Sequence, residues 1–150
     1  MRFGGEGAGR LMRDREEPFP YDPGYRIAVL LGERPFGDLP AWFGVVTAHN
    51  PWGRVVSDEE NVRADERLIR RVEEMGVEHF RVAGASPDRV HCEEGFGVVG
   101  LDLDRVCELS REFHQQAFFW VTGGWVFVCD DASGGGWRAG RLEERYHWVG

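Results

Sequence analysis

The sequence of 150 residues contains no lysine, and all 18 of its basic residues are arginine. Without lysine, the chain has no Schiff-base nucleophile, no lysine general base and no P-loop lysine. It also has only two asparagines, Asn50 and Asn61, and two glutamines, Gln115 and Gln116. This scarcity of lysine, asparagine and isoleucine is typical of a GC-rich genome. The amides that remain therefore indicate where the chain needs a neutral polar side chain.

Cysteine is also scarce, and Cys92, Cys107 and Cys129 lie far apart in the chain. Their odd number and wide spacing exclude a disulfide framework and a CxxC metal motif, so we expect buried, inert thiols. The five histidines show neither HxH nor HExxH spacing. His91 and Glu93 could both ligate a metal, but "HCEE" is more typical of a solvated loop. The sequence therefore predicts no metal site and no cofactor.

No apolar run reaches the length of a membrane span, and the N-terminus shows no apolar segment of a secretory signal. A cytoplasmic location is the resulting expectation, with no membrane partner. The formal net charge is −8, and the arginines alternate with carboxylates, as in "RADERLIRRVEEMG". A protein that binds nucleic acid usually presents a basic face to the phosphates, so nucleic acid is disfavoured as a partner.

The composition, with 42% hydrophobic and 13% aromatic residues, suits a single packed domain. Glycine, proline and charged residues dominate residues 1–24, which predicts a flexible N-terminal lead-in. The glycine-rich start of residues 131–150 predicts a flexible C-terminal tail. A single α+β domain is expected at residues 25–130.

Within this domain, β-branched and aromatic runs alternate with two charged, amphipathic stretches. The amphipathic stretches predict helices at residues 57–76 and 102–113. The predicted strands lie at residues 25–31, 42–48, 79–85, 95–101, 117–122 and 125–130. Gly123-Gly124 between the last two strands is typical of a tight hairpin turn.

The resulting element order is β-β-α-β-β-α-β-β, and its middle six elements read βαββαβ, the ferredoxin-like order. This order predicts a two-layer sandwich of the α+β class. In that fold, one mostly antiparallel sheet carries both helices on one face.

The helix at 57–76 begins with the motif S-x-x-E, a capping box formed by Ser57 and Glu60. Gly76 supplies the residue that ends a helix in the left-handed conformation. At about 100° per residue, Leu68 and Val72 define the face that points to the core. The same count places Asn61 on that face.

Asp65, four residues after Asn61, falls on the same inward face. A buried polar group without a partner is costly, so each of these two side chains needs one. Their partners are the backbone groups of loop 49–56, a ligand or ordered water. Asn50 precedes Pro51 in that loop and favours a turn. In the structural interpretation, the two asparagines hold a strand-to-helix loop in place. In the functional interpretation, they line a polar pocket.

A second polar cluster, Gln115 and Gln116, lies where the second helix gives way to a strand. The two glutamines serve either as partners for the helix end or as part of the same pocket. If the two junctions meet, at least one glutamine side chain is expected near Asn50 or Asn61.

The segments "TAHNP", "S-x-x-EN" and "F-x-Q-x-AFFW" resemble a small bacterial family catalogued as a domain of unknown function. The resemblance spans roughly residues 25–128. The chain departs from the family signature at His49, Asp65, His114 and Gln116. The family implies no activity, cofactor or partner, and it suggests only that the two amide clusters belong together.

Two function hypotheses follow, and whether the protein is an enzyme stays open. The first is a non-catalytic module that binds a small polar ligand or a protein partner at the strand-to-helix junction. The alternative is a small, hydrolase-like enzyme with His49 or Asp65 as general base. The candidate ligand-binding residues are Thr47, His49, Asn50, Ser57, Asn61, Asp65, Gln115 and Gln116. No catalytic residue is assigned beyond these two alternatives.

Overall fold

The computed structural model describes residues 12–13, 19–130 and 135–150. Its strands are β1 (Met12–Arg13), β2 (Val29–Gly32), β3 (Trp42–Thr47), β4 (Glu78–Ala85), β5 (Cys92–Glu93), β6 (Gly95–Val99), β7 (Ala117–Thr122), β8 (Trp125–Asp130), β9 (Gly136–Arg141) and β10 (Tyr146–Trp148). The α-helices are α1 (Gly24–Ile27), α2 (Asp58–Met75), α3 (Leu103–Glu112) and α4 (Leu142–Arg145). Two 3₁₀ turns, η1 (Phe36–Asp38) and η2 (Pro51–Gly53), complete the described elements.

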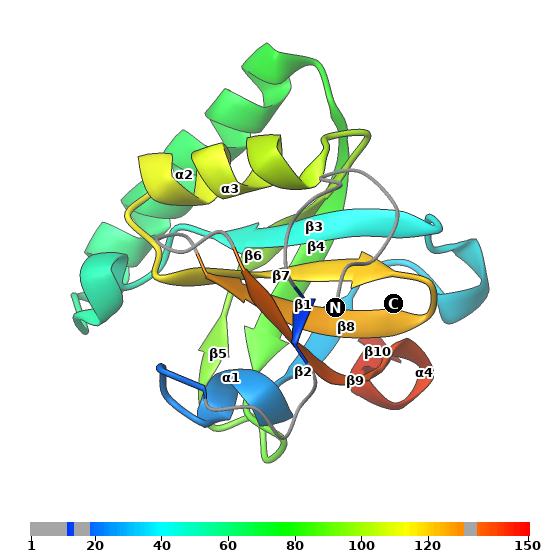
Figure 1. The fold of residues 1–150 in the computed structure, drawn as a ribbon. Coiled ribbons are helices and arrows are strands. Elements are labelled where there is room, and N and C mark those ends of the chain that lie inside the picture. The colour runs from blue at the N-terminus through cyan, green and yellow to red at the C-terminus, as the bar shows by residue number, and fades with distance from the viewer. Residues whose placement is uncertain (1–11, 14–18, 131–134) are drawn as a thin grey trace.

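The ten strands form one mixed sheet that curls into a half-barrel (Figure 1). Its strand order is β1-β9-β8-β7-β3-β6-β4-β2-β10, and β5 pairs with β4 outside this path. The strands from β9 to β2 pair antiparallel, whereas β1 with β9 and β10 with β2 are parallel pairs. The predicted hairpin of residues 117–122 and 125–130 is confirmed as β7 and β8.

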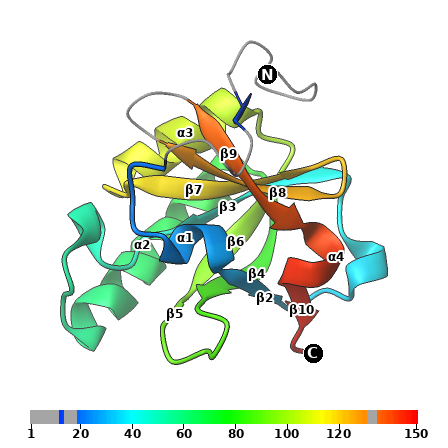
Figure 2. The same ribbon diagram turned by 60° about the horizontal axis from the view of Figure 1, so that its bottom comes forward.

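The predicted two-layer sandwich is wrong. Helices α2 and α3 cover the convex side of the sheet, but α1 and α4 lie on the concave side (Figures 1 and 2). The sheet also gains strands from segments that the sequence pattern assigned to the chain ends. These additions make the sheet wide enough to curl, so it encloses a second core instead of staying open on one face.

The two larger hydrophobic cores lie on opposite sides of the sheet. The convex-side core packs Leu68 and Val72 of α2 and Val106 of α3 against Phe96 of β6 and Trp120 of β7. The concave-side core joins Leu30 on β2 to Val126 on β8 and Leu142 on α4. Leu30 and Val126 belong to strands near opposite ends of the sheet, so only the curl brings them into one cluster.

Helix α2 agrees with the predicted helix at 57–76. The Ser57 side chain accepts a hydrogen bond from the Glu60 N–H at 3.1 Å, as the capping motif predicts. The helix ends at Gly76, whose φ of 69° is the left-handed conformation that favours glycine. Ala64, Leu68 and Val72 are buried, so the inward face is the predicted one.

Residues 25–31 were predicted as one strand, but the structure divides them between α1 and β2. The Asp22 carboxylate accepts a hydrogen bond from the Gly24 N–H at 2.7 Å. The backbone carbonyl of Asp22 then accepts from the Tyr25 N–H at 3.1 Å. This turn starts a short helix before the chain extends at Val29, because an aspartate side chain stabilises a helical start locally.

The predicted tail at 131–150 contains β9, α4 and β10 within its described part. Its glycines suggested flexibility, but Gly136 instead marks a close approach of neighbouring strands. A Cβ at Gly136 would lie 2.6 Å from the Met12 sulfur and 2.9 Å from the Cys129 sulfur. The predicted lead-in at 1–24 lies mostly outside the described residues, and flexibility of both chain ends stays a prediction.

The prediction of buried thiols is correct for Cys107 and Cys129 and wrong for Cys92. Cys92 lies in the short strand β5, which pairs only at the end of β4 and leaves this side chain exposed. Among the described residues, no helix combines the length and apolar character needed to cross a membrane.

Candidate functional site

The two asparagines form one hydrogen-bonded unit between β3 and α2. The Asn61 side-chain oxygen accepts from the backbone N–H of Asn50 at 2.9 Å, and its amide nitrogen donates to Asn50 Oδ1 at 3.2 Å. Asn50 Oδ1 also accepts from the Val56 N–H at 3.2 Å. Asn50 adopts a left-handed backbone with φ of 51°, which asparagine tolerates better than most residues. The pair therefore closes loop 49–56 onto the first turn of α2.

Asn50 also reaches the third element of the site, strand β5. Its side chain makes a hydrogen bond to the Glu93 carboxylate. Burial raises the pKa of Glu93, and the hydrogen bond from Asn50 opposes that rise. One amide thus connects the loop, the helix and a carboxylate that is partly withdrawn from water.

The second polar cluster meets the first. The Gln115 side-chain nitrogen donates to the backbone carbonyl of His49 at 3.0 Å and to that of Phe113 at 3.2 Å. The backbone N–H of Trp52 donates to the His114 carbonyl at 2.7 Å. The strand-to-helix and helix-to-strand junctions therefore lie side by side, as expected if the amide clusters belong together.

Four of the eight candidate residues have structural partners and line neither of the two cavities described below. Ser57 caps α2, and Asn50 and Asn61 close the loop. Gln116 packs over Gly53, where a Cβ would lie 3.2 Å from its Oε1. At these four positions, the contacts in the structure hold the loop and the helix end together, as the structural interpretation expects.

Asp65 is engaged by Arg81, whose Nη1 lies 3.1 Å from Oδ1 and 2.9 Å from Oδ2. Burial lowers the pKa of His49, although the nearby carboxylates of Asp65 and Glu94 oppose the effect. Neither Asp65 nor His49 lines either of the two cavities. The geometry therefore gives no support to the hydrolase-like alternative.

Thr47 and Gln115 line a cavity of about 310 Å³ on the concave side of the sheet. Its wall is largely apolar and includes Val45 and Val82 from the second core together with Phe119. Glu93 lines the same cavity. Thr47 and Gln115 are the candidate residues that border room for a ligand.

Two polar groups of this cavity differ in the hydrogen bonds left to them. Thr47 Oγ1 donates to the Glu94 carbonyl at 2.7 Å and accepts from the His49 N–H at 3.1 Å. Gln115 uses its nitrogen for two backbone carbonyls, which fixes the amide orientation and points to its oxygen as the acceptor that remains. That oxygen has no hydrogen-bond donor among the residues that the structure describes.

Sequence reasoning missed Glu93 as a site residue because "HCEE" was interpreted as a solvated loop. The usable signal was weak, since β5 has only two residues and its pairing with Gly84 and Ala85 is a tertiary contact. Glu93 meets Asn50, 43 residues earlier in the chain, because the fold brings the two segments together.

A second cavity, of about 490 Å³, lies on the other side of the loop, between α2 and the end of α3. Its lining includes Trp52 from the loop, Arg67 and Arg70 from α2, and His114. None of these four residues was a candidate in the sequence analysis. The end of β3 and the loop that follows it thus lie between two cavities on opposite sides of the sheet.

Residues 46–118, just under half of the chain, match the family described as "Protein of unknown function (DUF3293)". This match supports the resemblance to a domain-of-unknown-function family, whose description assigns no activity. No curated protein and no solved structure gave a significant match. All eight candidate residues fall within the matched segment, as do the cavity residues named above except Val45 and Phe119.

Proposed function

We propose that the protein binds a small molecule in the concave cavity, and that this ligand carries a basic amino group beside an apolar portion. The observation that carries the proposal is Glu93, a carboxylate in a largely apolar wall where burial raises its pKa. A cation beside this carboxylate would stabilise its charged form and offset the burial. Perturbed acids in clefts are over-represented at functional sites.

The acceptor left free on Gln115 supports the same ligand chemistry. An ammonium or amide N–H has donors for both Gln115 Oε1 and the Glu93 carboxylate. Asp22 lines the cavity as well and adds a second carboxylate. The polar groups named here are acceptors, so they favour a ligand that donates.

The size and wall of the cavity limit the ligand further. A volume of about 310 Å³ lies at the lower end of the range for small-molecule sites, roughly 300–1,000 Å³. Val45, Val82 and Phe119 would contact the apolar portion. A ring or a short branched alkyl group attached to an amine matches both properties.

The proposal is tested with three probes of similar shape: phenethylamine, 2-phenylethanol and 3-phenylpropionate. Chemical shifts of the backbone amides and of the Glu93 carboxyl carbon report binding and the protonation of that side chain. We expect the amine to bind most tightly, to shift resonances of Gln115 and Phe119, and to lower the pKa of Glu93. Equal binding of the amine and the alcohol, or no binding of the amine at millimolar concentration, would contradict the proposal.

A matched pair of variants separates the Glu93 carboxylate from general acidity. Glu93→Gln is expected to weaken binding of phenethylamine about ten-fold or more, because the ligand loses its ionic partner. Glu94→Gln removes the neighbouring exposed carboxylate, whose side chain does not line the cavity. It should change the affinity by less than about two-fold.

A further inference from the structure

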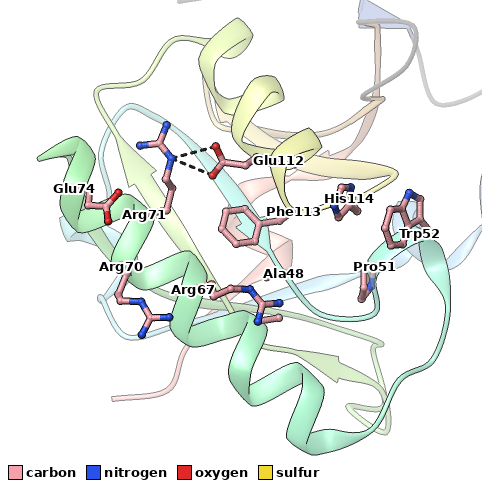
Figure 3. Close-up of a pocket in the computed structure, with 11 residues that line it drawn as sticks. Ala48, Pro51, Trp52, Arg67, Arg70, Arg71, Glu74, Glu112, Phe113 and His114 are labelled. Atoms are coloured by element: carbon pink, nitrogen blue, oxygen red, sulfur yellow. Dashed lines mark hydrogen bonds and ion pairs between the residues drawn. The ribbon is translucent and has the colours of Figure 1, made fainter.

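The larger cavity, on the convex side, has two walls of different chemistry (Figure 3). One wall is the arginine-rich face of α2, and the other is formed by Trp52, Phe113 and His114 at the paired junctions. Ala48 and Ala64 also line it, and their small side chains leave the space between the walls open. This cavity is separate from the concave one, and the function proposed above does not use it.

Two of the three guanidinium groups in the arginine wall have no partner among the described residues. Arg71 donates through Nε to both oxygens of Glu112, at 3.1 and 3.0 Å. Arg67 and Arg70 form neither an ion pair nor a hydrogen bond with any residue that the structure describes. Glu74 is the only other carboxylate among the cavity's lining residues, so its described lining carries three arginines against two glutamates. On a chain with a net charge of −8, this is a local excess of positive charge.

The aromatic wall presents a flat, exposed ring. The Trp52 indole stacks on the His114 imidazole with 4.0 Å between ring centroids and 16° between planes. The stack covers one face of the indole, yet 59% of Trp52 remains exposed. Large aromatic side chains are usually withdrawn from water, so an exposed stack of two rings beside a cavity is typical of a stacking platform.

The backbone that carries this platform is strained. Trp52 and His114 both have left-handed backbones, with φ of 56° and 57°. Such angles are rare for bulky residues and persist only where surrounding contacts hold them. The hydrogen bond from the Trp52 N–H to the His114 carbonyl joins the two strained residues directly. The strain thus positions an exposed ring pair that the core does not require.

We infer that this cavity binds a planar aromatic anion: a small molecule that joins an aromatic ring to a phosphate or carboxylate group. In Figure 3, His114 lies between Trp52 and the arginine wall, so the ring stacks on the exposed face of His114, with Trp52 behind it, and the anionic group pairs with Arg67 and Arg70. Guanidinium groups match the geometry of both phosphate and carboxylate oxygens, and the cavity volume of about 490 Å³ accommodates a ligand of mononucleotide size.

The surrounding charge selects a small anion over a polyanion. Outside the cavity, carboxylates are interleaved with the arginines along α2, including Glu66 and Glu73. A nucleic-acid strand needs positive charge along an extended path, which this helix does not provide. A single anionic group needs only the two free arginines.

The test uses probes that contain both parts of the ligand or only one. Adenosine monophosphate and indole-3-acetate are planar aromatic anions with different acids, whereas adenosine and inorganic phosphate each lack one part. Binding is followed through the indole N–H resonance of Trp52, assigned with a Trp52→Leu variant. We expect at least one aromatic anion to bind about ten-fold more tightly than either fragment. The aromatic anion that binds more tightly shows whether the site prefers a phosphate or a carboxylate group.

Two variants of α2 give the matched comparison. The double variant Arg67→Gln/Arg70→Gln is expected to weaken that binding about ten-fold or more, while Arg63→Gln, an exposed arginine of the same helix outside the cavity, leaves it unchanged. Circular dichroism checks that the helix content of both variants equals that of wild type. Glu93→Gln should leave this affinity unchanged, so failure of the concave-site proposal would not be mistaken for failure here.

Three results would overturn the inference: aromatic anions that bind no more tightly than their fragments, equal losses in the Arg63 variant and the double variant, or binding that leaves the Trp52 resonance in place.

Discussion

The two cavities lie on opposite sides of one sheet, next to the chain segment at the end of β3, yet their walls differ in chemistry. The concave cavity presents carboxylate and amide acceptors in an apolar wall. The convex one presents two guanidinium groups without a partner among the described residues, and an exposed aromatic pair. The difference arises because successive residues of one extended segment point to opposite faces, so Thr47 and Ala48 line different cavities.

The comparison teaches that the two asparagines line neither cavity. Asn50 and Asn61 form hydrogen bonds with the loop and with each other, and Asn50 also bonds to Glu93. Their effect on both cavities is indirect, because they hold loop 49–56, which lines the convex cavity through Pro51 and Trp52 and follows Thr47 of the concave one. A substitution of Asn61 should therefore alter both cavities, whereas a substitution of a wall residue should alter only the cavity that it lines.

The largest effect is expected for Asn61→Leu. The substitution removes the acceptor of the Asn50 N–H and the donor to Asn50 Oδ1, so partly buried polar groups lose their partners. The free energy of unfolding should fall by roughly 1–3 kcal/mol, measured by urea denaturation. Val62→Leu, at the exposed neighbouring position, serves as control. An unfolding midpoint at or above wild type would show that the asparagine pair does not stabilise the loop.

The next largest effect concerns Glu93 on the concave side, where the free energy of unfolding should depend on pH. Burial raises the pKa of Glu93 in the folded chain, so the unfolded chain loses this proton at a lower pH. Stability therefore falls as pH rises through the window between the two pKa values, and the loss is complete above the folded pKa.

Glu93→Gln removes this ionisation. Relative to wild type, the variant should gain stability from about pH 4 upward and reach a plateau above the folded pKa of Glu93. Thermal midpoints measured across about pH 4 to about pH 8 check the profile. A difference between variant and wild type that does not change with pH would mean that Glu93 titrates alike in both states.

A smaller effect is expected for Arg71→Ala on the convex side. The ion pair with Glu112 joins α2 to α3, but both side chains are more than a third exposed, at 41% and 45%. Exposed pairs contribute about 0.2–1 kcal/mol, and salt screens them. The loss of stability should shrink when unfolding is repeated in about 1 M salt, and an undiminished loss would point to packing instead of charge.

The smallest change in stability is expected for Trp52→Gly. Glycine adopts the φ of 56° freely, which relieves about 1–2 kcal/mol of backbone strain. The variant also loses the stack on His114, which is worth about 0.5–1.5 kcal/mol. The free energy of unfolding should stay within about 1 kcal/mol of wild type, while binding of an aromatic anion is lost. A large loss of stability would mean that the indole serves the fold.

Local structure was predictable wherever its cause lies within a few residues. Helix α2 begins after the capping residue Ser57 and ends at Gly76, as predicted. The Gly-Gly turn joins β7 and β8. The helical phase correctly placed Asn61 and Asp65 on the inward side of α2. Both found protein partners, Asn50 and Arg81, and the second of these was not foreseen.

The architecture was not predictable in the same way. Strand β9 joins the sheet although its six residues include two glycines and two arginines, because its place is set by β8 and β1 on either side. Strand β10 pairs in parallel with β2, more than 100 residues earlier in the chain. Such pairings between distant segments leave no periodic signal in either segment, and they turned an expected open sheet into a curled one.

By itself, the sequence determined the ends of α2, the hairpin, and the location of a polar junction between a strand and a helix, since capping groups, turn residues and helical phase act over short distances. Only the tertiary structure decided that the junction has a cavity on each side. It also placed Glu93 beside Asn50 and Trp52 over His114, because burial and stacking depend on which distant segments the sheet brings together.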